Sequence, residues 1–242
     1  MEGFSPLNVL VPQRSTSSVH PLHPSRHDTI YHVVLSVDNK LGSKIVTVRS
    51  PLSVGNHTAH ALSLYYQKSA LTSIGENLIG ETVNPFDDLV RVAVIEPNET
   101  YSVPLFVAYH CKLFIHPSYM ENCRVSEACI WWRDFKDNAC QEIYCLDKEN
   151  AEQVMFSLSA IAIRDDKNDE ASVPNYLIKL MAPIRVHNFL PLSIELLLPT
   201  TNRQLRIENG AAADVYELGT STIKKVEIKV SISTSCLSIY NN

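Results

Sequence analysis

The stretch that decides the fold is residues 178–198, IKLMAPIRVHNFLPLSIELLL, where apolar residues alternate on both sides of Asn188. Residues 46–66, VTVRSPLSVGNHTAHALSLYY, repeat this pattern around Asn56, which lies 132 positions earlier. The same offset aligns Pro51 with Pro183, Leu52 with Ile184, Val54 with Val186, Leu62 with Ile194 and Leu64 with Leu196. A repeat of fixed period indicates tandem copies of one structural unit. We therefore interpret the chain as two copies, of which the second is shorter.

Short segments of β-branched and aromatic residues follow one another along most of the chain. Residues 45–49 and 60–66 alternate apolar and polar side chains with a period of two, which is typical of strands. Turn residues separate the segments, and no segment has a convincing helical period. We predict strands at residues 31–37, 45–49, 60–66, 89–95, 101–110, 112–117, 128–135, 141–146, 153–163, 176–180, 193–198, 204–207, 214–218 and 223–232.

This succession of strands indicates an all-β fold of tandem β-sandwich repeats, one complete and one truncated. Residues 1–29 are rich in Pro, Ser and His, so we expect an irregular lead-in, with room for an edge strand at residues 8–11. Residues 30–172 would form the first β-sandwich repeat and residues 173–242 a partial second one. The chain also has room for the last strands of a preceding copy.

The composition argues against several classes of function. The formal net charge is −5 and the basic residues are scattered, whereas a nucleic-acid surface needs clustered Lys and Arg. The seven Gly form no GxGxxG or Walker pattern, which argues against a phosphate cradle. The six Cys form no CxxC pair, so we expect neither a metal site nor a cofactor.

Catalytic and secretory signals are also missing from the sequence. No HExxH, GxSxG or paired-carboxylate motif supports an enzyme, so we predict a non-catalytic protein. His110, Cys111 and His116 could supply a nucleophile or metal ligands, but His on neighbouring strands more often packs or caps. Without a signal peptide or a membrane-spanning run, we expect a cytosolic chain with reduced thiols. The alternative is a secreted, disulfide-linked adhesion module that uses the sequons at Asn56 and Asn98.

Four residues are candidates for function. Asn56 and Asn188 could each satisfy backbone groups at a corner between two strands. They could also hold open a groove beside a sheet edge, where an extended peptide adds as a strand, and the two roles are compatible. Trp131 and Trp132 are candidates for contact with a partner. Because adjacent residues of a strand point to opposite faces, we expect one in the core and the other at a surface or module interface.

The segments SPLSVGNHTAHALSL and APIRVHNFLPLSIELLL resemble the repeat signature of the vacuolar protein sorting-associated protein thirteen family, the bridge-like lipid-transfer proteins. Each segment carries a small residue, Pro, an aliphatic residue, Val and then the asparagine, followed by an apolar strand. The resemblance covers about residues 30–242. It departs from the family pattern after Asn56, which is followed by His57 and Thr58 without the Leu-Pro of the second copy. The family's domain has more repeats than this chain holds, so we expect a fragment of the adaptor-binding repeat domain.

The resemblance implies β-sandwich repeats that each carry one such asparagine, here Asn56 and Asn188, in support of peptide binding. It implies proline-containing adaptor proteins on organelle membranes as partners, recognised through Pro-x-Pro motifs, with indirect membrane association and no nucleic acid. It further implies a cytoplasmic protein, peripheral at organelle membranes and contact sites, that serves intermembrane lipid transport and vacuolar protein sorting. The alternative from another class is a structural β spacer that stacks repeats within a rod-like protein.

Overall fold

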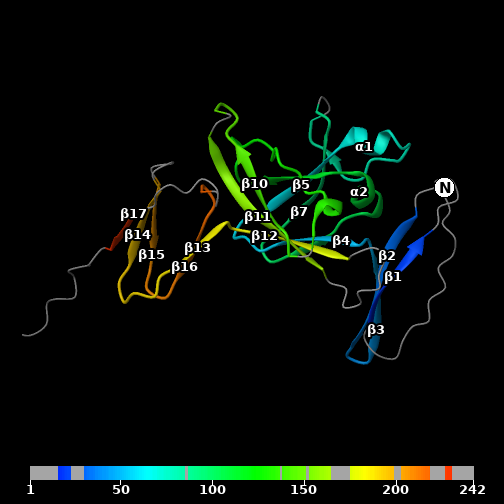
Figure 1. Ribbon diagram of the computed structural model, residues 1–242, viewed down its shortest axis with the longest axis horizontal. Helices are drawn as coiled ribbons and strands as arrows, with labels where there is room; N and C mark the ends of the chain where they lie inside the picture. The colour runs from blue at the N-terminus through cyan, green and yellow to red at the C-terminus, as the bar shows by residue number, and fades with distance from the viewer. Residues whose placement is uncertain are drawn as a thin grey trace, which may run out of the picture.

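The computed structural model describes residues 16–22, 30–84, 87–136, 138–150, 153–164, 175–198, 203–218 and 227–230. Figure 1 shows three β-structures in a row along the chain: a sheet of β1, β2 and β3, a central sandwich, and a smaller sandwich that holds β13 to β17. The predicted all-β fold of tandem β-sandwich repeats is therefore confirmed.

The first sheet is antiparallel and has the order β1-β2-β3. Its strands are β1 (Thr16–Leu22), β2 (Tyr31–Lys40) and β3 (Ser43–Arg49). A two-residue turn joins β2 to β3, with positive φ at Leu41 (49°) and Gly42 (82°), as tight hairpins of this kind require. The expectation of irregular structure for residues 1–29 is wrong for Thr16–Leu22, because these residues pair with all of β2 from Tyr31 to Val37. Residues 8–11 lie outside the described residues.

The central sandwich consists of two sheets that share one core. The five-stranded sheet has the order β10 (Cys140–Leu146), β11 (Val154–Arg164), β12 (Tyr176–Met181), β4 (Leu52–Asn56) and β8 (Thr100–Ser102). The four-stranded sheet has the order β6 (Glu81–Thr82), β7 (Leu89–Ile95), β5 (Leu62–Gln67) and β9 (Leu113–Pro117). Leu52 and Leu158 of one sheet and Leu64 and Ile115 of the other are buried in the same cluster. Among the described strands, β12 and β4 form the one parallel pair.

The smaller sandwich also consists of two sheets, but each of them has fewer strands. Its strands are β13 (Ile184–His187), β14 (Ile194–Leu198), β15 (Arg203–Ile207), β16 (Ala212–Val215) and β17 (Glu227–Val230). β13 pairs with β16, and the other sheet has the order β15-β14-β17. Leu196, Leu198, Val215 and Leu218 form its core.

Each strand of the smaller sandwich has a counterpart in the central sandwich. β4, β5, β7, β8 and β9 occupy the places of β13, β14, β15, β16 and β17, with matching partners. Leu62 pairs with Ile95 as Ile194 pairs with Ile207, so the offset is 132 positions on the first strand but 112 on the second. The first copy therefore carries 20 extra residues between Leu62 and Ile95, and they include α1 (Lys68–Thr72) and β6.

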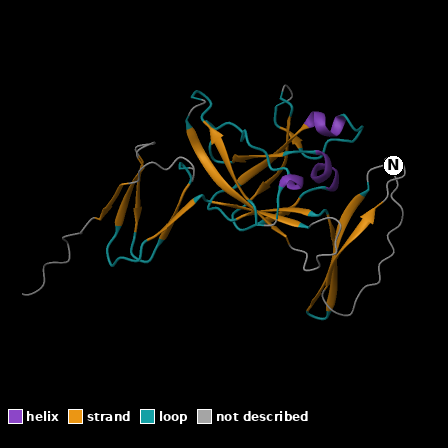
Figure 2. Cartoon of the chain, viewed as in Figure 1, coloured by secondary structure: helices purple, strands orange, loops and turns teal. Residues whose placement is uncertain are grey.

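Three short helical segments correct the prediction of an all-strand chain: α1 (Lys68–Thr72), α2 (Leu105–His110) and the 3₁₀ turn η1 (Trp132–Asp134). Figure 2 shows them gathered on the side of the central sandwich away from β13. The predicted strand at 101–110 ends at Ser102, and Pro104 is the N-cap of α2, whose Val107 and Ala108 are buried in the core. The predicted strand at 128–135 is reduced to a single bridge at Ile130. In both segments burial against the core overrides the local alternation.

Candidate functional site

Asn56 closes the corner between β4 and β5 with hydrogen bonds to the backbone. Its Nδ2 donates to the carbonyl oxygens of His60 and Ile95, both at 2.8 Å. Its Oδ1 accepts from the backbone N–H of Thr58 at 3.0 Å and from the Thr58 hydroxyl at 2.7 Å. The side chain is fully buried. Both amide hydrogens and both oxygen lone pairs are thus used within the corner.

Asn188 makes the equivalent contacts at the corner between β13 and β14. Its Nδ2 donates to the carbonyl oxygens of Leu192 at 2.7 Å and Ile207 at 2.9 Å, and its Oδ1 accepts from the N–H of Leu190 at 3.0 Å. The partners lie at the positions aligned with His60, Ile95 and Thr58 of the first copy. The two asparagines belong to separate sandwiches, and the structure does not bring them together. Each one holds its own corner.

The buried state of Asn56 bears on the secreted alternative. N-glycosylation needs an accessible amide nitrogen, and that of Asn56 is buried and bonded to two carbonyls. The second sequon residue, Asn98, is exposed in a turn with φ of 64°. The folded chain therefore offers one of the two sequons.

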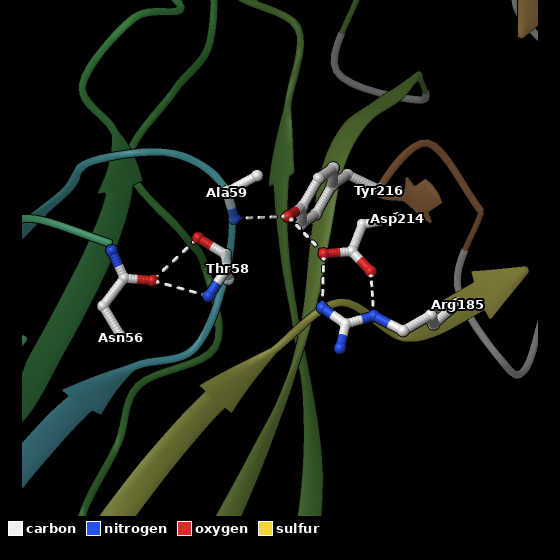
Figure 3. A network of polar contacts seen from close by, with 6 residues as sticks. All are labelled: Asn56, Thr58, Ala59, Arg185, Asp214 and Tyr216. Carbon is white, nitrogen blue, oxygen red and sulfur yellow. Dashed lines mark hydrogen bonds and ion pairs between the residues drawn. The ribbon is translucent and has the colours of Figure 1, made fainter. Parts of the chain in front are cut away.

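A polar network runs from the Asn56 corner into the smaller sandwich (Figure 3). The backbone N–H of Ala59, in the loop that Asn56 holds, donates to the hydroxyl of Tyr216 at 3.0 Å. This hydroxyl donates to Oδ2 of Asp214 at 3.2 Å. Arg185 binds the same carboxylate through Nε at 2.6 Å and through a terminal nitrogen at 2.9 Å. β13 and β16 are therefore tied to the loop that follows β4.

Tyr216 is the centre of this joint. Its ring stacks on Phe156 with centroids 4.9 Å apart, and its carbonyl accepts from both the N–H (2.7 Å) and the hydroxyl (2.6 Å) of Ser157. Burial raises the pKa of Tyr216, whereas the hydrogen bond from Arg185 lowers the pKa of the Asp214 carboxyl. Tyr216 thus stays a neutral donor beside a carboxylate. No sequence motif marks it, apart from its place within the predicted strand at 214–218.

The two tryptophans occupy different environments. Trp132 is 5% exposed and donates its indole N–H to the carbonyl of Ala108, while Trp131 is half-buried. Trp132 begins η1 and Trp131 is its N-cap, so strand alternation does not explain their different environments and the predicted strand is wrong here. Trp131 is therefore the more accessible of the two rings.

Trp132 forms one wall of a pocket of about 350 Å³ at the junction between the first sheet and the central sandwich. Its lining residues are Ile30 and His32 at the start of β2, Tyr109 of α2, Trp132, Arg133 and Phe135 at η1, and Tyr176 of β12. The hydroxyl of Tyr109 accepts the backbone N–H of His32 at 2.8 Å, and that of Tyr176 donates to the carbonyl of Phe135 at 3.2 Å. Four segments far apart in the sequence are thereby fixed around the recess.

A cation lies over this aromatic lining. The guanidinium carbon of Arg133 is 5.4–5.7 Å from the ring centroids of Trp131, Tyr109 and Trp132, which is cation–π distance. Among the described residues no carboxylate forms an ion pair with Arg133. Aromatic walls of this kind accept apolar rings such as proline, and the guanidinium can accept a carboxylate beside them.

His110, Cys111 and His116, which were considered as a nucleophile or as metal ligands, do not form such a site. The hydroxyl of Tyr31 is bonded to Nε2 of His110 at 2.8 Å, and Nε2 of His116 donates to the carbonyl of Cys123 at 3.1 Å. Burial raises the pKa of the Cys111 thiol to about 12, the opposite of activation. Within the described ranges no group of three His, Cys, Asp or Glu is arranged to hold a metal ion. No helix in those ranges is long and apolar enough to cross a membrane.

Known proteins are similar to this chain over most of its length. The family model for the vacuolar-sorting associated protein 13 adaptor binding domain matches residues 2–238. Intermembrane lipid transfer protein VPS13C of Mus musculus is 28% identical over 193 residues, and that of Homo sapiens 26% over 214 residues. Intermembrane lipid transfer protein VPS13 of Chaetomium thermophilum is 25% identical over 193 residues. These alignments cover 76%, 84% and 78% of this chain but 5% of each relative.

Proposed function

Because this chain belongs to the vacuolar-sorting associated protein 13 adaptor binding domain family, we propose that it is the adaptor-binding part of a large intermembrane lipid transfer protein. In this proposal it is non-catalytic and cytoplasmic, and it reaches membranes only through its partners. It captures Pro-x-Pro peptides of adaptors on organelle membranes, and so brings the lipid-transfer protein to contact sites.

The aromatic pocket between β2, α2, η1 and the start of β12 is the observation that supports peptide capture best. Proline-rich segments are pre-organised as polyproline II helices, so they lose little conformational entropy when they bind. They dock in grooves whose walls are aromatic. Tyr109, Trp132, Phe135 and Tyr176 supply such walls, and the recess lies between two β-structures rather than within one.

The Asn56 corner supports this pocket through the sheet. Asn56 fixes the end of β4, and β4 pairs in parallel with β12. The first residue of β12 is Tyr176, whose N–H donates to the carbonyl of Pro51 at 2.8 Å. Asn56 therefore acts on the pocket as a positioning residue, without contact to the peptide. Asn188 would have the same relation to a pocket in the second copy.

The Tyr216 joint favours a second candidate, a spacer that stacks repeats into a rod. A stacking function needs contacts between repeats and no ligand. The network from Ala59 through Tyr216 and Asp214 to Arg185 supplies such contacts. Peptide binding by the isolated chain distinguishes the two candidates.

Calorimetric titration with a Pro-x-Pro peptide tests the proposal, with an Ala-x-Ala peptide of otherwise equal sequence as the control. We expect saturable binding of the proline peptide alone. Ile30→Ala truncates an apolar pocket residue that is 48% exposed, and it should weaken binding several-fold. Val83→Ala truncates an apolar residue that is 55% exposed outside the pocket, and it should have no effect. Equal binding of both peptides, or none to the folded chain, would overturn peptide capture and leave the spacer.

A further inference from the structure

Two buried cysteines lie against each other in the core of the central sandwich. Cys123 and Cys145 are each 1% exposed and belong to the same cluster of apolar side chains. Both are free thiols, and a side-chain hydrogen bond joins them. The sulfur of Cys145 also lies 3.4 Å from the carbonyl oxygen of Ile115. The pair is therefore a dithiol whose sulfurs are already within hydrogen-bonding distance.

The backbone places both thiols on one face of a short antiparallel bridge. Cys123 pairs with Asp147, and the N–H of Arg124 donates to the carbonyl oxygen of Leu146 at 2.8 Å. Cys145 lies two positions before Asp147, so its side chain points to the same face as those of Asp147 and Cys123. The two sulfurs are therefore diagonal neighbours across the bridge, close enough for their side chains to touch.

The two cysteines differ in how firmly their backbone is held. Cys145 lies within β10, which pairs with β11 from Cys140 to Leu146. Cys123 lies outside the described strands, in the loop that follows β9, and its neighbours Asn122 and Arg124 are exposed. Local opening of this loop can bring Cys123 to water without breaking the sheet. It also gives the loop room to draw the two sulfurs together to the length of a covalent bond.

The two thiols also differ in how readily they ionise. The hydrogen bond from Cys145 lowers the pKa of the Cys123 thiol, whereas the same hydrogen bond and burial raise the pKa of Cys145. Cys123 therefore ionises first, and the thiolate is the form of cysteine that reacts with an oxidant. Cys111, which is equally buried, has its pKa raised to about 12 by that burial.

We propose that Cys123 and Cys145 are a redox site, at which a hydroperoxide such as hydrogen peroxide forms a reversible disulfide. The Cys123 thiolate attacks one peroxide oxygen: the S–O bond forms, the O–O bond breaks, and hydroxide leaves and takes up a proton as water. The Cys145 sulfur then attacks the sulfenic sulfur of Cys123. The S–S bond forms, the S–O bond breaks, and hydroxide leaves with the proton of Cys145 as a second water. Two electrons pass from the sulfurs to the peroxide.

The disulfide would close a loop that contains one wall of the aromatic pocket. Residues 123–145 include η1, and Trp132, Arg133 and Phe135 of this segment line the pocket. The bond therefore ties together the two ends of the segment that carries this wall. Thiol–disulfide exchange with a reduced thiol opens it again. This inference rests on the two thiols and is independent of the proposed function.

Peptide mapping of the oxidised, folded chain tests the site. Cys140 lies on the same tryptic peptide as Cys145, so the sample is the full chain with Cys140→Ser, which changes an exposed side chain. Hydrogen peroxide is added to the folded chain, which is then unfolded in the presence of iodoacetamide. We expect peptide 113–124 linked to peptide 137–148, with the combined mass reduced by two hydrogen atoms. The linked fraction should be independent of protein concentration and should disappear with dithiothreitol.

Two variants in the same background test the order of attack. Cys145→Ser leaves Cys123 at the sulfenic acid, which dimedone labels, whereas Cys123→Ser should leave Cys145 at least several-fold less labelled. Equal labelling would overturn this order. The Cys140→Ser sample itself has an unchanged core, so its result does not depend on whether these variants fold. If its oxidised, folded form lacks the linked peptides, or links Cys123 equally to other cysteines, the proposal is overturned.

Discussion

Substitution of Asn56 by Ala should destabilise the central sandwich more than any exposed polar substitution. The change leaves the carbonyl of Ile95 and the N–H of Thr58 without partners, and both residues are at least 97% buried. A buried group that loses its partner costs about 1–3 kcal/mol. The carbonyl of His60 keeps the Thr58 hydroxyl as a donor, so it adds little. We therefore expect a loss of about 2–5 kcal/mol in the free energy of unfolding.

The same reasoning gives a smaller loss at Asn188. Its substitution strands the carbonyl of Ile207, which is buried, but the N–H of Leu190 belongs to a residue that is 47% exposed and can turn to water. One buried group predicts a loss of about 1–3 kcal/mol. The order of the two variants is thus fixed by the burial of their partners.

Urea unfolding measures both variants. Tryptophan fluorescence follows the central sandwich, where Trp131 and Trp132 lie, and hydrogen exchange of the amides in β14 and β15 follows the smaller one. Asn98→Gly is the control, because Asn98 is exposed with φ of 64° and Gly tolerates this conformation. A change of less than about 0.5 kcal/mol for Asn56→Ala, or a larger loss at Asn188, would show that the buried partners of these asparagines do not set the stability of the two corners.

Three further predictions concern charge and thiol chemistry. The hydrogen bond from Arg185 lowers the folded pKa of Asp214, so its contribution to stability is complete above the ordinary value of 3.8 and is lost as pH falls through the lowered value. The difference in melting temperature between the unchanged chain and Asp214→Asn should accordingly shrink below about pH 4, and a constant difference would contradict this. Alkylation followed by peptide mapping should find Cys140, which is exposed, modified long before Cys111, whose pKa burial raises to about 12; equal rates would contradict the burial. At low salt, Arg133→Ala should weaken the binding of a Pro-x-Pro peptide with a flanking Asp by about 0.5–1 kcal/mol more than the binding of one with a flanking Ser. Equal losses would show that Arg133 does not bind the carboxylate of the peptide.

The strands and the repeat could be predicted from the sequence because both depend on local pattern. The alternation in residues 89–95 gave the bounds of β7, and the repeated Asn56 and Asn188 marked equivalent corners. α2 could not be predicted, since its sequence alternates like a strand and only burial of Val107 and Ala108 against the core decides for a helix.

The pocket and the Tyr216 joint depend on long-range contacts that cannot be recognised from local sequence patterns. The pocket forms only when β12 pairs with β4 and α2 packs against β2. These contacts bring together Ile30, Tyr109, Trp132 and Tyr176. Likewise, Tyr216 meets Ala59 across 157 positions. Long-range contacts of this kind depend on the topology. The sequence repeat indicates two copies of one unit, but it does not determine which strands pair with each other.

The location of peptide binding is tested most directly by tryptophan fluorescence, because both tryptophans of the chain, Trp131 and Trp132, lie in or beside the pocket. Titration with a Pro-x-Pro peptide should give a saturable change in emission that the Ala-x-Ala peptide does not produce. Phe135→Ala removes part of the pocket wall, so it should weaken binding of the Pro-x-Pro peptide several-fold. Peptide binding that leaves the emission unchanged and is insensitive to Phe135→Ala would contradict the account, as would the absence of binding.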